Sequence, residues 1–181
     1  MSSGYKILNE EAISSPKNRK HQLVDATVKT PEGQEVVWQY IKTRDVVTIV
    51  AINDQNHIYC VRQWRPAVKD YVWELPAGGV EGLGSTNEQI LQNANREIQE
   101  EISLSAGKLE LLANFRPSIH MACTYHVILA RDLRTGALPP DPDELIEIRI
   151  LPYTEAYDLM VNNQTPSALT LIGLLLAKPF I

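Results

Sequence analysis

Arg96-Glu97-Ile98-Gln99-Glu100-Glu101 is the stretch of this chain on which the interpretation of the rest depends. Glu97 lies three residues before Glu100 and four before Glu101, so the three carboxylates share one side of an α-helix. Like charges at these spacings repel by a few tenths of a kcal/mol per pair. A helix that keeps this arrangement needs a compensating interaction, and a bound cation would supply one.

An apolar stripe runs along the same predicted helix, which we place at about residues 88–102. Its members recur at helical spacing: Leu91, Ala94, Ile98 and Ile102. The carboxylates lie beside this stripe, so we expect them at the rim of the core, where clustered charge requires compensation. Oxygen ligands suit Mg²⁺ or Mn²⁺, which in turn suit phosphate substrates. For the short pattern alone, a solvated acidic face is the simpler interpretation.

A longer pattern favours the metal-binding interpretation. Gly82 lies six residues before Glu88, and Glu88 lies eight residues before Arg96. With the three glutamates and the Ser103-Leu104 pair, this spacing resembles the Nudix box. Ser103 stands where the family has glycine, at the end of the helix, and serine can be accommodated there.

The residues that lead into the box carry a second likeness. Trp73-Glu74-Leu75-Pro76-Ala77-Gly78 resembles the entry to the box in ADP-ribose and nucleoside diphosphate sugar pyrophosphatases. In those enzymes this glycine is the first of the box, whereas Gly78 lies ten residues before Glu88. We interpret the difference as an insertion of four residues in the loop at about residues 79–84.

The likeness covers roughly residues 44–177. Residues 61–66 are similar to a family segment that contains a Gln-Tyr-Arg sequence, and residues 143–147 are similar to the acidic loop before the last strand. The resemblance implies an α/β fold, a Nudix α/β/α sandwich with a mixed sheet. Residues 1–43 match the family only by their β content.

Strand-like runs surround the predicted helix. We predict one hairpin from residues 22–29 and 35–42, a second from 46–52 and 57–64, and single strands at 72–75, 108–115, 124–131 and 145–151. Two further helices are predicted at about residues 155–161 and 167–177. The chain is therefore divided into an N-terminal β sub-domain, residues 1–43, and a Nudix hydrolase domain, residues 44–181.

The composition excludes several other classes of protein. A net charge of −5 argues against non-specific nucleic-acid binding, which relies on Lys and Arg. Cys60 and Cys123 form no CxxC pair and fit a reducing compartment. We see no signal peptide and no apolar run long enough to span a bilayer. These features predict a cytoplasmic enzyme that binds neither nucleic acid nor membranes.

The resemblance also implies roles for individual residues. Two or three Mg²⁺ ions, or Mn²⁺ in their place, would be held by the box glutamates and one backbone carbonyl: Glu97, Glu100, Glu101 and Ala77. Arg96 points to another side of the helix, and we expect it to pair with Glu88 or Glu97 and fix its rotamer. A simple surface ion pair is the alternative for Arg96. Glu101 and Arg96 are counted among the catalytic residues.

A carboxylate in the acidic loop is the expected general base. Glu144 is the first choice, because the resemblance matches it to the acidic-loop residue that related pyrophosphatases use. A carboxylate in a loop can close over the substrate and take a proton from the attacking water. Asp143 and Glu147 are the alternatives. Both lie within three residues of Glu144, so the sequence leaves the choice open.

Other side chains are candidates for substrate binding. Three of them have a structural ion pair as the alternative: Arg65, Glu74 and Arg116. Trp38, Tyr40 and Trp64 could stack on a base, but aromatic residues in strands more often belong to the core. His120 and His126 lack the spacing of metal ligands, and we take both as structural.

The reaction implied by the resemblance is hydrolysis of the pyrophosphate bond of a nucleoside diphosphate sugar to a nucleoside monophosphate and a sugar phosphate. ADP-ribose is the first substrate to consider and GDP-mannose the second. In the resembling enzymes the N-terminal sub-domain is exchanged between subunits and contributes to the partner's site, so we expect a homodimer. The alternative is a Nudix-like module that binds a nucleotide sugar as a sensor, but such modules usually lose box glutamates, which this chain keeps.

Overall fold

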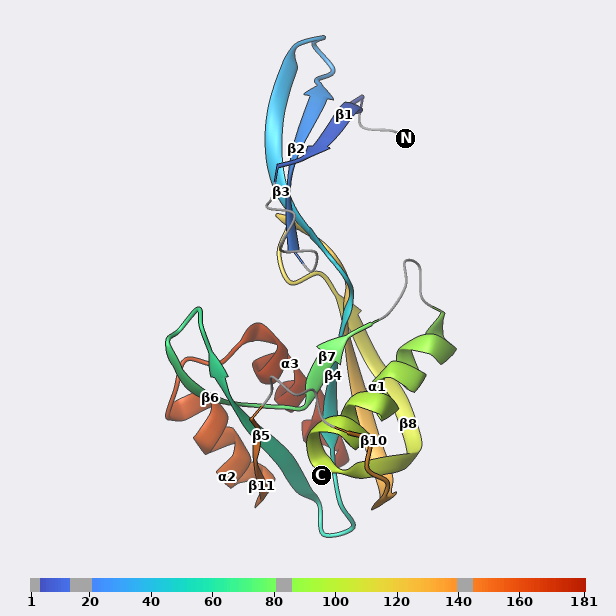
Figure 1. Ribbon diagram of the computed structural model, residues 1–181, viewed down its shortest axis with the longest axis vertical. Helices are drawn as coiled ribbons and strands as arrows, with labels where there is room; N and C mark the ends of the chain where they lie inside the picture. The colour runs from blue at the N-terminus through green and yellow to red at the C-terminus, as the bar shows by residue number, and fades with distance from the viewer. Residues whose placement is uncertain (1–3, 14–20, 81–85, 140–144) are drawn as a thin grey trace. The chain divides into compact units, whose positions relative to one another are not determined.

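The computed structural model describes residues 4–13, 21–80, 86–139 and 145–181 (Figure 1). It divides the chain into two compact units. The N-terminal unit combines Met1–Arg44 with Arg116–Thr124, and the larger unit combines Asp45–Phe115 with Tyr125–Ile181. The sequence-based boundary after residue 43 lies beside the first division, but the segment Arg116–Thr124 was not expected to join the N-terminal strands.

The larger unit contains two sheets. The first has the strand order β7-β4-β10-β8 and is mixed, because β4 and β10 are parallel while the other pairs are antiparallel. Its strands are β4 (Val46–Ala51), β7 (Ala77–Gly79), β8 (Leu104–Phe115) and β10 (Tyr125–Thr135). The second sheet has the order β11-β5-β6 and consists of β5 (His57–Arg65), β6 (Asp70–Glu74) and β11 (Glu147–Pro152).

Helices cover both faces of the larger unit (Figure 1). The long helix α1 (Asn87–Ile102) packs its apolar face on Val47 and Ile49 of β4 in one core. The opposite face of β4, at Val50, packs in a second core against α2 (Tyr153–Tyr157), the π-helical turn η1 (Asp158–Asn162) and α3 (Ala168–Ala177). A 3-10 turn, η2 (Lys178–Phe180), follows α3. The predicted α/β/α sandwich is confirmed.

Helix α1 is delimited by local sequence signals. Thr86 caps its N-terminus by accepting a hydrogen bond from the Gln89 N–H, while the Gln89 side chain accepts one from the Thr86 N–H. Ser103 ends the helix in the left-handed region, at φ 60° and ψ 28°. Glycine adopts this conformation at least cost, which explains the glycine that the family has at this position.

The N-terminal unit is a single four-stranded sheet with the order β1-β2-β3-β9. Its strands are β1 (Lys6–Ala12), β2 (His21–Lys29), β3 (Glu35–Thr43) and β9 (Met121–Ala122). The antiparallel pairing of β2 with β3 confirms the first predicted hairpin. Strand β1 was missed because its apolar residues Ile7 and Leu8 are adjacent and its other residues are mostly polar, so no alternation of apolar residues marks it.

The second predicted hairpin is wrong beyond its turn. Asn53 accepts backbone hydrogen bonds at Oδ1 from Gln55 and His57, so the turn forms. Only one bridge, Ile52 to Ile58, then joins the two segments. β4 is buried and pairs on its two edges with β7 and β10, whereas β5 pairs with β6 and β11. Alternation identified the strands but could not identify their partners.

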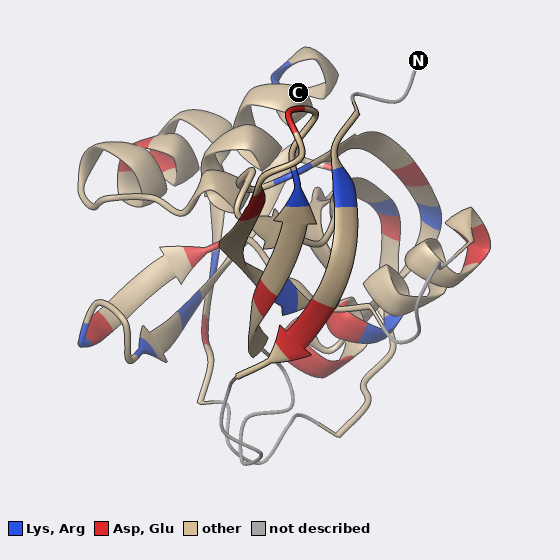
Figure 2. Ribbon diagram, turned by 90° about the horizontal axis from the view of Figure 1, so that it is seen from above, with Lys and Arg blue, Asp and Glu red and all other residues tan. Residues whose placement is uncertain are grey.

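Two further findings concern the predicted helices. The helix expected at residues 155–161 begins earlier, at Tyr153, and its second half is the π-helical turn η1. Within the described residues, no helix is both long and apolar enough to cross a membrane. Lys and Arg positions are interspersed with Asp and Glu along the described strands and helices (Figure 2).

Candidate active site

The three box carboxylates lie on the last two turns of α1, on the side that faces β5 and β7. Glu97 is 8% exposed and Glu101 5% exposed, while the Glu100 side chain is 20% exposed. The expectation that they lie at the rim of the core is therefore confirmed, and two of them are buried. A solvated acidic face is excluded for Glu97 and Glu101.

Arg96 neutralises two of these carboxylates. Its Nη2 donates to Glu97 and its Nη1 donates to Glu100, and Nη2 also lies 3.4 Å from the carbonyl oxygen of Gly79. Of the two partners expected from the sequence, Glu97 is confirmed. Glu88 accepts a hydrogen bond from Gln92 Nε2 at 3.3 Å. The Arg96 side chain is 34% exposed, so its ion pairs are partly shielded from water.

Two neutral donors bind the Glu101 carboxylate. Its Oε1 accepts from Gln63 Nε2 at 3.1 Å, and its Oε2 accepts from the backbone N–H of Ala77 at 3.1 Å. Gln63 lies in β5 and Ala77 lies in β7, so the two donors come from two different strands that face α1. The contact of Gln63 was not foreseen. Strand alternation places Gln63 on the same side as Val61, which would have indicated a buried amide.

The backbone of Gly78 lies in close contact with the Glu97 carboxylate. A Cβ atom built on Gly78 would lie 2.0 Å from Cδ of Glu97 and about as close to both carboxylate oxygens. Any side chain at this position must therefore displace the Glu97 carboxylate. The glycine of the Pro-Ala-Gly sequence is required here because β7 passes directly beside the acidic face of α1.

The donor atoms fit a hard divalent cation in their chemistry. They are carboxylate oxygens next to a backbone segment, with no sulfur or imidazole ligand among them. In the residues that the structure describes, no three His, Cys, Asp or Glu side chains are grouped as they are around a metal ion, and Arg96 forms ion pairs with both Glu97 and Glu100. A divalent cation would take over the positive charge that Arg96 provides to these two carboxylates.

Arg65 and Glu74 form an ion pair, with Nε of Arg65 2.7 Å from Oε2 of Glu74. Glu74 lies opposite Val61 in the β5–β6 register, so the pair lies on the same side of the sheet as Gln63. The structural ion pair that we weighed as the alternative for these residues is thus present. Arg116 lies in the N-terminal unit, where it lines a groove described below.

The acidic-loop candidates are only partly described. Glu144 and Asp143 lie outside the described residues, as do Gly82 and most of the predicted loop insertion. Glu147 lies in β11, where its carboxylate accepts from Arg62 at 3.1 Å and from Arg149 at 3.4 Å. Two guanidinium groups therefore engage the nearest described alternative to Glu144.

The expectation for the tryptophans is wrong, whereas the expectation for His126 agrees with the structure. Trp38 is 54% and Trp64 50% exposed, so the expectation that these two belong to the core is wrong. His126 is buried, and its Nδ1 lies 2.6 Å from Oδ1 of Asn114, which agrees with a structural role. Burial raises the pKa of the Cys60 thiol to about 12, so this cysteine is not a nucleophile.

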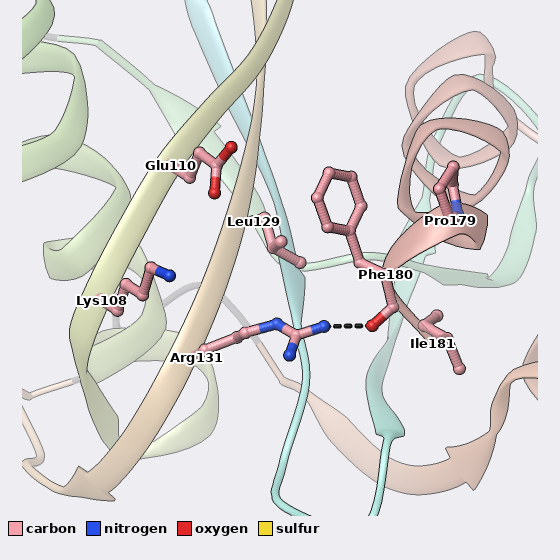
Figure 3. Close-up of a pocket in the computed structure, with 7 residues that line it drawn as sticks. All are labelled: Lys108, Glu110, Leu129, Arg131, Pro179, Phe180 and Ile181. Atoms are coloured by element: carbon pink, nitrogen blue, oxygen red, sulfur yellow. Dashed lines mark hydrogen bonds between the residues drawn. The ribbon is translucent and has the colours of Figure 1, made fainter.

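A separate cavity of about 490 Å³ lies on the opposite side of the larger unit, between β8, β10 and η2 (Figure 3). Arg131 spans it and donates to the carbonyl oxygen of Phe180 (Figure 3). Lys108 and Glu110 of β8 also line it. None of the residues around this cavity is a predicted site residue.

The buried carboxylates, the arginine between them and the adjoining glycine strand agree with the family pattern. The family model described as the NUDIX domain matches residues 42–171, and the chain belongs to this family. It is a Nudix pyrophosphohydrolase, an enzyme that hydrolyses nucleoside diphosphate compounds. The predicted family and enzyme class are thus confirmed.

Individual relatives narrow the description. The chain is 27% identical to an ADP-ribose pyrophosphatase of Bacillus subtilis (strain 168), with 91% of this chain and 90% of the relative covered. It is 28% identical to a methanol dehydrogenase activator of Bacillus methanolicus, over 93% of this chain and 89% of the relative. A crystal structure of an ADP compounds hydrolase has the same fold, with a TM-score of 0.82, 22% identity and coverage of 97% and 93%.

The close approach of Gly78 to Glu97 gives a testable prediction. Gly78→Ala must displace the Glu97 carboxylate from β7. We expect hydrolytic activity to fall by roughly 10–100-fold, because misplacing one catalytic group by about 1 Å has effects of this size. The measurement is kcat and KM for a nucleoside diphosphate sugar, together with the melting temperature.

Gly107→Ala is the matched control. A Cβ atom there would lie 2.5 Å from Oδ2 of Asp132, but this side chain is 58% exposed and can rotate away. We expect its activity to match that of the unmodified enzyme. Equal activity of Gly78→Ala and Gly107→Ala would show that the position of Glu97 does not matter for the reaction.

Proposed function

We propose that the enzyme hydrolyses the pyrophosphate bond of a nucleoside diphosphate sugar in a Mg²⁺-dependent reaction. ADP-ribose is the first choice of substrate, because two of the relatives are named for ADP-ribose or ADP compounds, and GDP-mannose is the second. The observation that carries the proposal is the group of three glutamates on α1, two of them buried, beside Ala77 and Gly78. Negative charge buried in this way suits a site that binds cations and, through them, a diphosphate.

Different residues of the chain would hold the metal ions and orient the metal ligands. Glu97, Glu100, Glu101 and the backbone carbonyl of Ala77 would hold two or three Mg²⁺ ions, with Mn²⁺ as a substitute. Bound Mg²⁺ would neutralise charge on the diphosphate while the bond to the leaving phosphate breaks. Arg96 keeps Glu97 and Glu100 on one side of the helix through its two terminal nitrogens. Water attacks one phosphorus, and the products are a nucleoside monophosphate and a sugar phosphate.

Arg65, Glu74 and Arg116 are the proposed substrate-binding residues. The Nε bond to Glu74 fixes the plane of the Arg65 guanidinium, whose geometry matches two oxygens of a phosphate. Glu74 is only 15% exposed in its side chain, so it is rigid enough to orient Arg65. Arg116 belongs to the N-terminal unit.

The substrate and the metal are tested together by a panel of nucleoside diphosphate sugars. We expect Mg²⁺-dependent phosphate release after phosphatase coupling, greatest for ADP-ribose, and complete loss on chelation. Glu100→Gln should lower kcat at least about a hundredfold, since metal charge neutralisation supplies several kcal/mol of the barrier reduction. Glu110→Gln, an exposed carboxylate of β8, is the control and should leave kcat unchanged. Turnover without a divalent ion, or normal turnover by Glu100→Gln, would contradict the proposal.

Glu144 is the proposed general base, and its variant is compared with those of its neighbours. Glu144→Gln should lower kcat by roughly 10²–10⁴-fold while substrate binding is kept, because the amide cannot accept the proton of the attacking water. Asp143→Asn and Glu147→Gln should retain most activity. For Glu147 the reason is structural, since its carboxylate is engaged by Arg62 and Arg149. If one of the neighbours is inactive and Glu144→Gln is not, the base has been assigned to the wrong residue.

We also propose that the protein is a homodimer formed through the N-terminal unit. A groove of about 970 Å³ lies in this unit alone, lined largely by apolar side chains that include Ile7, Trp38 and Ile119. These three residues are 64%, 54% and 92% exposed. Contiguous apolar surface of this kind is typical of a protein interface. A second copy of the chain would cover it, and a reducing cytoplasm suits the two buried cysteines, which form no disulfide.

Ile119→Glu tests the dimer without disturbing the fold, because the side chain is 92% exposed. We expect the dimer dissociation constant, measured by sedimentation, to rise at least about tenfold, since a carboxylate must then be buried without a partner. Leu145→Glu, at a residue that is 82% exposed in the other unit, is the control and should remain dimeric. A monomeric unmodified protein, or an unchanged Ile119→Glu dimer, would exclude this interface.

A further inference from the structure

Gln63 is a buried amide in the middle of the candidate site. It lies in β5, is 5% exposed and donates from Nε2 to Oε1 of Glu101 across 3.1 Å. Val61, on the same side of the strand, packs in the core that α1 covers. The Gln63 side chain is therefore packed between a strand and a helix, and this packing restricts its conformation.

The hydrogen bond from Gln63 is one of two that hold the Glu101 carboxylate, one at each oxygen. The backbone N–H of Ala77 donates to the other oxygen, Oε2, also at 3.1 Å. The two donors come from different strands, β5 and β7, so the carboxylate is fixed in both position and plane. Glu101 is only 5% exposed, and rotation about its terminal bond would break both hydrogen bonds.

The chemistry of the donor distinguishes Glu101 from its neighbours. Glu97 and Glu100 are paired with the positive charge of Arg96, which a divalent cation has to replace. Gln63 and the Ala77 amide are neutral donors, so their contribution to Glu101 is to orient the carboxylate. Glu101 is thus the box carboxylate that is already oriented before any cation binds.

We propose that Gln63 is a positioning residue: it fixes the rotamer of Glu101 so that this carboxylate binds a divalent cation with no reorientation. The inference rests on the proposed function, because it assumes that Glu101 is a metal ligand. Groups that hydrogen-bond to metal ligands typically change metal affinity or activity 10–100-fold when they are removed. A purely structural glutamine would change only the stability of the fold.

The test measures Mn²⁺ binding by electron paramagnetic resonance, without substrate, in Gln63→Met and Gln63→Leu. Methionine keeps the length of the side chain and removes the donor, so it remains informative if the leucine variant does not fold. We expect the Mn²⁺ dissociation constant to rise roughly 10–100-fold and kcat at saturating metal to fall, with KM for ADP-ribose nearly unchanged. Melting temperatures are recorded for each variant.

Gln164→Leu is the matched control. The Gln164 amide also bridges to a strand, accepting from the Trp73 N–H at 3.0 Å and donating to the Trp73 carbonyl oxygen at 2.5 Å. Trp73 packs in the core on the other side of the sheet. We expect this variant to lose stability and to keep the Mn²⁺ affinity of the unmodified enzyme.

The outcomes separate the inference from the function on which it rests. If the unmodified enzyme neither binds Mn²⁺ nor hydrolyses ADP-ribose, the proposed function fails and the role of Gln63 fails with it. If the unmodified enzyme does both, and a folded Gln63 variant binds Mn²⁺ equally well, only the positioning role is overturned. Equal losses of Mn²⁺ affinity in Gln63→Met and Gln164→Leu would also overturn it, because they would indicate a general loosening of the fold.

Discussion

Burial of carboxylate charge on α1 is the constraint on which the rest of the site depends. Glu97 and Glu101 lie among apolar residues, where an ionised group is stable only with a counter-charge or hydrogen-bond donors. The surrounding structure supplies both kinds of partner. Arg96, one residue before Glu97, gives positive charge from the helix itself, whereas Gln63 and Ala77 give neutral donors from two strands.

These partners depend on strands whose position is set by the two cores. β4 is buried on both faces and pairs with β7, which places Ala77 and Gly78 beside α1. The second sheet brings β5 to the same side of the helix, so Gln63 meets Glu101. A larger residue at position 78, or a shift of one residue in β5, would remove a contact from the acidic group. The site is therefore coupled to the fold by packing, and not by the helix alone.

The two units have different balances of exposed and buried apolar surface. The larger unit buries a continuous set of aliphatic side chains on each face of β4. In the N-terminal unit, Trp38 and Ile119 are largely exposed, and burial on β2 is limited to Val24, Ala26 and Val28. A small sheet with one open apolar face is the usual condition of an element that is stabilised by association. The three glutamates of the acidic group, Glu97, Glu100 and Glu101, all lie in the larger unit.

The sequence by itself determined the long helix, its three carboxylates and the class of chemistry, because helical spacing and the Thr86 cap act between residues a few positions apart. It also located most strands, since alternation of apolar residues is equally local. The partners of the strands required the tertiary structure: β4 and β5 diverge into separate sheets, and the segment Arg116–Thr124 joins the N-terminal strands. The tertiary structure also decided the hydrogen bond from Gln63 to Glu101 and the contact of Gly78 with Glu97. These contacts join residues that are 38 and 19 positions apart in the sequence. Such contacts form only when the strands have paired in the correct register, and a short segment of sequence does not determine that pairing.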